Sequence, residues 1–94
     1  MNDVTKQIDE FCRRRGWDHY HDPASLAMAI ASEAGELCHL YRWSRIDGPP
    51  DAAAVEDEVA DVLIFALRLC SVLNVDPTEI VKRKVKKNAA KYPA

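Results

Sequence analysis

The sequence contains few of the residues that build turn-rich or cross-linked proteins. Among 94 residues there are three glycines, three cysteines and only 7% aromatic residues. This composition disfavours a turn-rich β-sandwich and favours helices. The cysteines, Cys12, Cys38 and Cys70, are odd in number and form no CxxC pair, which argues against a disulfide framework and against a zinc site. We therefore expect buried free thiols in a reducing compartment, the cytoplasm.

Long apolar segments and a strong net charge are also absent. The stretch MNDVTKQIDE is polar and lacks the apolar core of a secretory signal. The longest apolar run, Val62–Leu67, is far too short to span a bilayer. A formal net charge of −2 provides no overall field that would attract nucleic acid or an anionic membrane. We expect one domain over residues 1–94, with neither nucleic acid nor a membrane as a partner.

Apolar periodicity and helix-capping signals predict four helices in an all-α domain. Asp22 and Asp76 are each followed by proline, the arrangement of an N-cap and a first helical position, and Asp76-Pro77-Thr78-Glu79 reads as a capping box. Gly16 is expected to stop the first helix, and SRIDGPP, 44–50, to end helical structure after the second. The predicted helices are about Val4–Arg15, Pro23–Arg42, Ala52–Leu73 and Pro77–Lys91.

The third predicted helix is apolar on nearly every side. Val55, Val59 and Val62 begin one stripe, whereas Ile64 and Phe65 lie on other faces. A helix of this kind is buried on most sides, and three short neighbours are not enough to cover it. We therefore expect a four-helix bundle with antiparallel neighbours that assembles into a homo-oligomer, a dimer or a tetramer, with this helix near the interface.

Two pairs of acidic residues lie beside apolar stripes on neighbouring predicted helices. Glu33 and Glu36 are three residues apart on the second helix, and Glu58 and Asp61 have the same spacing on the third. One such pair is common on solvent-facing helices, but two pairs on adjacent helices predict a shared site. Four converging carboxylates repel one another, and a hard divalent cation such as Mg²⁺ offsets that cost with oxygen ligands.

With these acids in place, the sequence resembles the all-α nucleotide pyrophosphohydrolases of the MazG-like superfamily, and most closely the small dCTP pyrophosphatase branch. The resemblance rests on RGWDHYHDP, EAGELCHLYRW, EDEVADVLIFAL and the ending KxxxNxxKYP, in that order, from about Phe11 to Pro93. It implies a single MazG-like domain over residues 1–94. It also implies Mg²⁺-dependent cleavage, with Mn²⁺ as a substitute, of a nucleoside triphosphate between its α and β phosphates. The products are the monophosphate and pyrophosphate, and the role is to clear surplus or noncanonical nucleotides.

The resemblance also assigns roles to individual positions. Glu33, Glu36, Glu58 and Asp61 match the metal ligands of the family, and one of them that is not fully engaged by metal is the candidate to activate water. The positions that match the nucleotide pocket are Trp17, His21, Trp43, Phe65, Lys84, Asn88 and Tyr92. On the residues alone, the two tryptophans fit base stacking and core packing equally well. Lys84, Lys87, Asn88 and Lys91 share one helical face, which suits either a phosphate and base clamp or a solvated basic surface.

Two departures from the family pattern bear on base preference. Ala24 and Ser25 stand where relatives often carry a basic residue and asparagine, and Phe65 stands where relatives often carry tyrosine. The first departure puts a substrate contact from these side chains in question, and the second removes a hydroxyl near the pocket, so both bear on base preference more than on the reaction. The expected substrate is a pyrimidine deoxynucleotide such as dCTP or a modified dCTP. The alternative is dUTP, or many triphosphates with little discrimination.

Two other classes of function compete with this interpretation. A ferritin-like di-metal bundle uses two Glu-x-x-His motifs, and Glu36-x-x-His39 supplies only one of them. A small helical interaction module would use the apolar third helix as a partner surface, but such a module has no need of four inward-facing acids.

Overall fold

The computed structural model describes all 94 residues and contains helices but no strand. Four helices are long, and two helical elements are only four residues each. In chain order the elements are α1 (Asn2–Arg14), the 3-10 helix η1 (Trp17–Tyr20), α2 (Pro23–Leu40), α3 (Ser44–Asp47), α4 (Ala52–Leu73) and α5 (Pro77–Lys91). The prediction of an all-α chain with four long helices is confirmed.

Local sequence signals fix most of the helix ends. Three aspartates act as N-caps: the side chains of Asp22, Asp51 and Asp76 accept hydrogen bonds from the first-turn backbone of α2, α4 and α5. Gly16 follows α1 with a φ of 66°, a left-handed conformation that favours glycine. Asp76 accepts from Thr78 N, two residues on, so the cap forms without the reciprocal Glu79 bond of a capping box.

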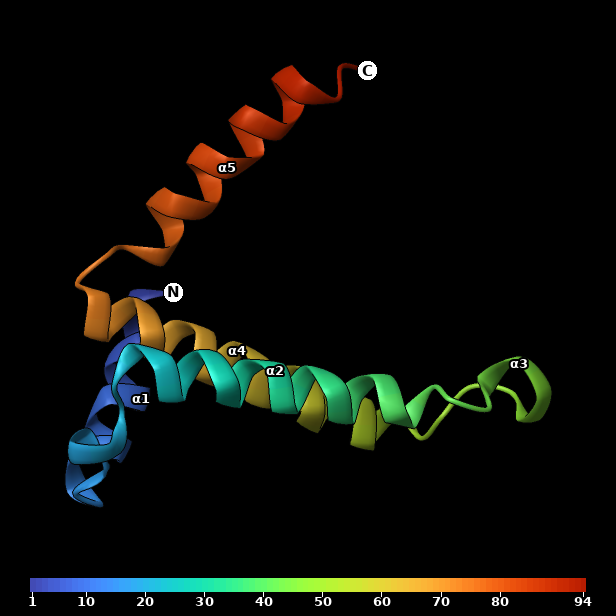
Figure 1. Cartoon of the computed structure of the whole chain (residues 1–94), viewed down its shortest axis with the longest axis horizontal. Coiled ribbons are helices and arrows are strands. Elements are labelled where there is room, and N and C mark those ends of the chain that lie inside the picture. The colour runs from blue at the N-terminus through green and yellow to red at the C-terminus, as the bar shows by residue number, and fades with distance from the viewer.

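Two of the long helices form the frame of the molecule. Figure 1 shows α2 and α4 running antiparallel along the longest dimension, with α1 crossing one end of the pair and α3 at the other end. Ile8 and Cys12 from α1 pack with Leu67 from α4 in the core at the α1 end. Leu26, near the start of α2, is the most deeply buried side chain and is only 1% exposed. None of the helices is both long and apolar enough to cross a membrane.

The last helix does not join this bundle. Figure 1 shows α5 extending away from α2 and α4 after the turn at Asn74–Asp76. Pro77 at its start is buried, but every residue from Val81 to Ala94 is exposed. The expected antiparallel packing of the fourth helix on its neighbours is therefore not seen within one chain. The short connection was a weak guide, because it fixes where a helix starts but not what it packs against.

Three smaller expectations need correction. The segment SRIDGPP does not end helical structure at once, since Ser44–Asp47 forms α3 before Gly48 and the two prolines stop it. The segment between the first two predicted helices, where no helix was expected, is largely the 3-10 helix η1. All three cysteines are free, as expected, but only Cys12 is buried, whereas Cys38 on α2 is exposed.

Candidate active site

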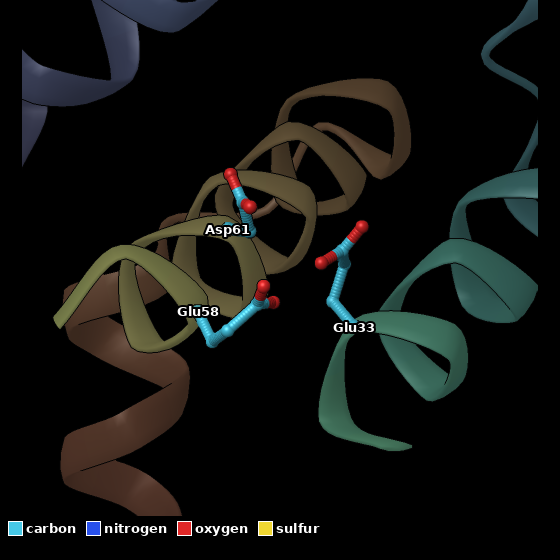
Figure 2. Close-up of side chains that lie close together, drawn as sticks. All are labelled: Glu33, Glu58 and Asp61. Carbon is cyan, nitrogen blue, oxygen red and sulfur yellow. The ribbon is translucent and has the colours of Figure 1, made fainter. Parts of the chain in front are cut away.

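Three of the four predicted acids meet between α2 and α4. Ligating oxygens of Glu33, Glu58 and Asp61 all lie within 4.8 Å of one another. Figure 2 shows the Glu33 side chain projecting from α2 toward Glu58 and Asp61 on α4. The three-residue spacing on α4 places its two acids one turn apart on the same side, so that the antiparallel neighbour can face both. All three residues are partly buried.

This cluster is electrostatically unfavourable on its own. The pKa of Glu58 is raised, chiefly because hydrogen bonding to Glu33 favours the protonated form; burial and the negative charges of Glu33, Glu36 and Asp61 raise it further. When Glu58 is ionised, its buried Oε2 has no hydrogen-bond partner. An unpartnered buried carboxylate oxygen in an all-oxygen cluster is the environment that a hard divalent cation satisfies, so these residues fit Mg²⁺.

We expect the pKa of Glu58 to be visible in the stability of the metal-free protein. Because its pKa in the folded state lies above the ordinary value of 4.5, the folded chain takes up a proton before the unfolded chain does. The resulting stabilisation is fully present at pH values below the ordinary pKa, and it is lost as the pH rises through the raised pKa of the folded state. Urea unfolding with a chelator present should therefore give a free energy of unfolding that falls as pH rises over this window.

The substitution Glu58→Gln should flatten that dependence and stabilise the metal-free protein at neutral pH, because the amide carries no charge. Glu56, exposed on the same helix, offers the matched control: Glu56→Gln should keep the wild-type slope. Equal slopes in wild type and Glu58→Gln would contradict this account of the cluster.

Glu36, the fourth predicted acid, is not a member of the close cluster. Its residue is exposed on α2, one turn beyond Glu33. It is still near enough for its charge to contribute to the raised pKa of Glu58. Glu36 is therefore outside the close cluster, although its charge acts on it.

A largely apolar cavity adjoins the acids. It has a volume of about 440 Å³ and reaches from Asp61 to the α1 and η1 end of the molecule. Three predicted pocket residues, Trp17, His21 and Phe65, are in its wall. Phe11 packs against Trp17 edge to face, with ring centroids 5.5 Å apart, which holds the indole at the cavity. The cavity has the size and aromatic lining of a site for a small planar group.

The cysteine in the cavity wall is not a candidate nucleophile. Cys12 lines the cavity from α1 and is buried. Burial raises the pKa of the Cys12 thiol, so the thiol stays protonated and unreactive.

The other predicted pocket residues lie elsewhere in the chain. Trp43 precedes α3 as its N-cap, and α3 is at the opposite end of the α2–α4 pair from α1 (Figure 1). Lys84 and Asn88 lie in the exposed part of α5, and Tyr92 directly follows this helix. A single chain therefore does not bring these four residues to the cavity, nor does it sandwich a base between Trp17 and Trp43.

Sequence reasoning missed Arg68, a charged residue that lines the cavity, together with its acidic partners. Arg68 of α4 donates hydrogen bonds to Asp9 of α1, to Asp18 of η1 and to His21. One signal could have found it, since Arg68 is the only charged residue in the apolar stretch Val62–Leu73. A lone charge in such a run predicts that partners of opposite charge or hydrogen-bond acceptors lie within its reach.

Comparison with known proteins agrees with this geometry. The model of the MazG-like family matches residues 28–94. Proteins named dCTP pyrophosphatase 1 from Homo sapiens and Mus musculus are 33% and 31% identical to the chain over 100% and 99% of its length. The chain spans 59% of the length of each of these relatives.

A solved structure extends the likeness to three dimensions. A crystal structure of a pyrophosphatase from Archaeoglobus fulgidus superposes with a TM-score of 0.85 and is 39% identical in sequence. The match covers 100% of this chain and 93% of that one, so α5 and the α2–α4 pair are both included. With a family model that matches most of the sequence and a fold shared over its whole length, the chain belongs to the MazG-like family.

Proposed function

We propose that the protein is a metal-dependent nucleoside triphosphate pyrophosphohydrolase that converts a triphosphate to the monophosphate and pyrophosphate. The observation that carries this proposal is the meeting of Glu33, Glu58 and Asp61 beside an aromatic cavity, with a buried Glu58 oxygen that lacks a partner. The names of the relatives, dCTP pyrophosphatase 1 and a pyrophosphatase, agree with this reaction.

The carboxylates would hold Mg²⁺, or Mn²⁺ in its place, with Glu36 completing the ligand set from the edge of the site. When bound, the ion supplies neutralisation of phosphate charge and stabilises the leaving pyrophosphate. The chain itself has to position a water molecule in line with the bond between the α and β phosphates. A carboxylate oxygen that is not engaged by metal would accept the proton of that water.

The aromatic cavity would receive the base. Trp17 and Phe65 offer ring faces for stacking, and His21 offers a polar edge in the same wall. We propose a pyrimidine deoxynucleotide, such as dCTP or a modified dCTP, as the preferred substrate, which would make the protein a scavenger of surplus or noncanonical nucleotides. Asp61 is in the wall of this cavity, which supports the proposal because a base bound in the cavity would have its phosphates near the acids.

We also propose that the working form is a homo-oligomer. Only 5 of 94 residues are buried, and the radius of gyration is 15.8 Å, whereas a compact chain of this length is expected near about 12 Å. Exposed apolar side chains continue along α4 and α5, namely Val59, Leu63, Ile64, Val72, Leu73, Val81 and Val85. A second copy that covers these faces would supply the burial that one chain lacks. It could also bring Lys84, Asn88 and Tyr92 of its α5, and Trp43, to the cavity.

Product analysis tests the reaction directly. Purified protein is incubated with a panel of canonical and modified nucleoside triphosphates, with Mg²⁺ or with chelator, and the products are separated by ion-exchange chromatography. We expect monophosphate and pyrophosphate only in the presence of metal, with dCTP or a modified dCTP cleaved fastest. Release of inorganic phosphate and a diphosphate would contradict the proposed bond. A flat ranking over all bases would support the broad-specificity alternative, and no cleavage would favour a non-catalytic binding role.

A further inference from the structure

Arg68 is the most completely engaged cation of the molecule. Although it is charged, its side chain is only 11% exposed, and it lies in an otherwise apolar stretch of α4. Each part of the guanidinium has a separate acceptor: Nη1 donates to Asp9 at 2.8 Å, Nη2 donates to Asp18 at 2.7 Å, and Nε donates to Nδ1 of His21 at 3.0 Å. Ser71, three residues along α4, donates to the other oxygen of Asp9 at 2.9 Å and steadies that carboxylate.

This arrangement is more than a structural ion pair, because one of its three acceptors is a ring nitrogen. Two carboxylates already more than neutralise the single positive charge of Arg68, and they anchor it to α1 and to η1. The guanidinium orientation is therefore fixed by groups other than His21. Arginine remains protonated in proteins and has no acceptor, so the nitrogen that faces Nε must offer a lone pair.

The protonation of the imidazole follows from this contact. With Nδ1 accepting from Arg68, a neutral ring carries its proton on Nε2. The Nε2 atom makes no hydrogen bond within the chain, and the ring lines the cavity together with Trp17 and Phe65.

We propose that Arg68 is a positioning residue that fixes His21 as the Nε2–H tautomer, so that the cavity wall presents one oriented hydrogen-bond donor to a carbonyl oxygen of a pyrimidine base. The second half of this inference rests on the proposed function, because it takes the cavity as the base site. When a ligand fills an apolar cavity, a hydrogen-bond donor in its wall loses its bound water. A base with an acceptor at that point replaces the lost hydrogen bond, whereas a group without one leaves the donor unpaired and binds more weakly.

The tautomer can be measured without any substrate. Proton–nitrogen correlation spectra of the histidine side chains distinguish Nε2–H, Nδ1–H and doubly protonated rings, and a His21→Gln variant assigns the signals among the three histidines. At neutral pH we expect His21 to be a single Nε2–H tautomer in the wild type and an exchanging mixture in Arg68→Met. The matched control is Ser71→Ala, which removes a hydrogen bond of the same cluster and leaves the contact to His21 intact.

A mixed or doubly protonated His21 in the wild type would overturn the proposal, and so would an unchanged tautomer in Arg68→Met. If Arg68→Met does not fold because Asp9 and Asp18 lose their partner, the wild-type spectrum alone still decides the first half. Arg68→Lys then serves as the second variant, since it keeps the charge but has no Nε–H to direct at the ring.

Kinetics test the second half. For dCTP, Arg68→Met should raise KM by about three- to tenfold, the effect of one neutral hydrogen bond, with a smaller change in kcat. For a deoxyribose triphosphate that lacks a base, the same variant should leave KM unchanged. Equal losses for both compounds would assign Arg68 a purely structural role. Wild-type protein that cleaves no triphosphate would refute the proposed function, whereas the spectra would still test the Arg68–His21 contact.

Discussion

Replacing Glu33 or Glu58 with glutamine should reduce metal-dependent triphosphate cleavage by about 100-fold or more, because either change removes an anionic ligand from a cluster of three. The oxygens of Glu33, Glu58 and Asp61 that face one another lie within 4.8 Å, so each amide would present a neutral, partly donating group to the same ion. Steady-state rates of pyrophosphate release with saturating Mg²⁺ would measure the effect.

The loss should come from the site and not from unfolding. Both glutamines match the shape of the glutamates, and Glu58→Gln also removes charge repulsion, so the metal-free variant should be at least as stable as the wild type. Circular dichroism checks the fold. Binding of Mn²⁺, followed by the paramagnetic signal of the free ion, should weaken in both variants and thus gives a readout apart from activity.

Glu56→Gln is the control for this experiment. Glu56 lies on the same helix as Glu58, but it is exposed and is not in the cluster, so its replacement should leave both the rate and Mn²⁺ binding unchanged. Wild-type activity in Glu33→Gln or Glu58→Gln would refute the ligand assignment. If activity fell but Mn²⁺ binding did not, that glutamate would be assigned to activating water and not to binding the metal.

The helices could be predicted closely from the sequence because their ends depend on local contacts. Asp22 followed by Pro23 marks the start of α2, and Asp76 followed by Pro77 marks the start of α5. The predicted bounds of α4 are also those of the structure. Both predicted acids on α4 and one of the two on α2 lie close together, because a three-residue spacing puts Glu58 and Asp61 on the side of α4 that faces Glu33.

The features that sequence reasoning missed depend on contacts between distant segments. The direction in which α5 leaves the other helices cannot be predicted from its own residues. Val81 and Val85 indicate an apolar face, but they do not indicate which surface this face would contact. Arg68 finds its acceptors 47 to 59 residues away along the chain. A lone arginine in an apolar run predicts that it has partners but not which residues they are, so the link from Arg68 to His21 could be found only from the fold.

The exposed α5 leads to a second prediction with a large effect, that neighbouring copies share their sites. If α5 of one copy serves the cavity of another, Glu33→Gln and the double variant Lys84→Ala/Asn88→Ala should each be nearly inactive alone. Co-expressed, they should regain activity, because a mixed dimer has one cavity with intact acids that faces an intact α5. Random pairing would restore about a quarter of the wild-type rate, since half of the dimers are mixed and each has one complete site.

The alternatives give distinct results. Light scattering should report a mass at least twice the 10.6 kDa of one chain, and a fully active monomer would refute the oligomer proposal. Lys87→Ala, on the same exposed helix, is the control and should remain active without a partner variant. No recovery in the mixed oligomer would mean that α5 folds back onto its own cavity or that its residues act only on the surface. Recovery would explain why a helix that carries Lys84 and Asn88 extends into solvent: its binding site lies on the next copy.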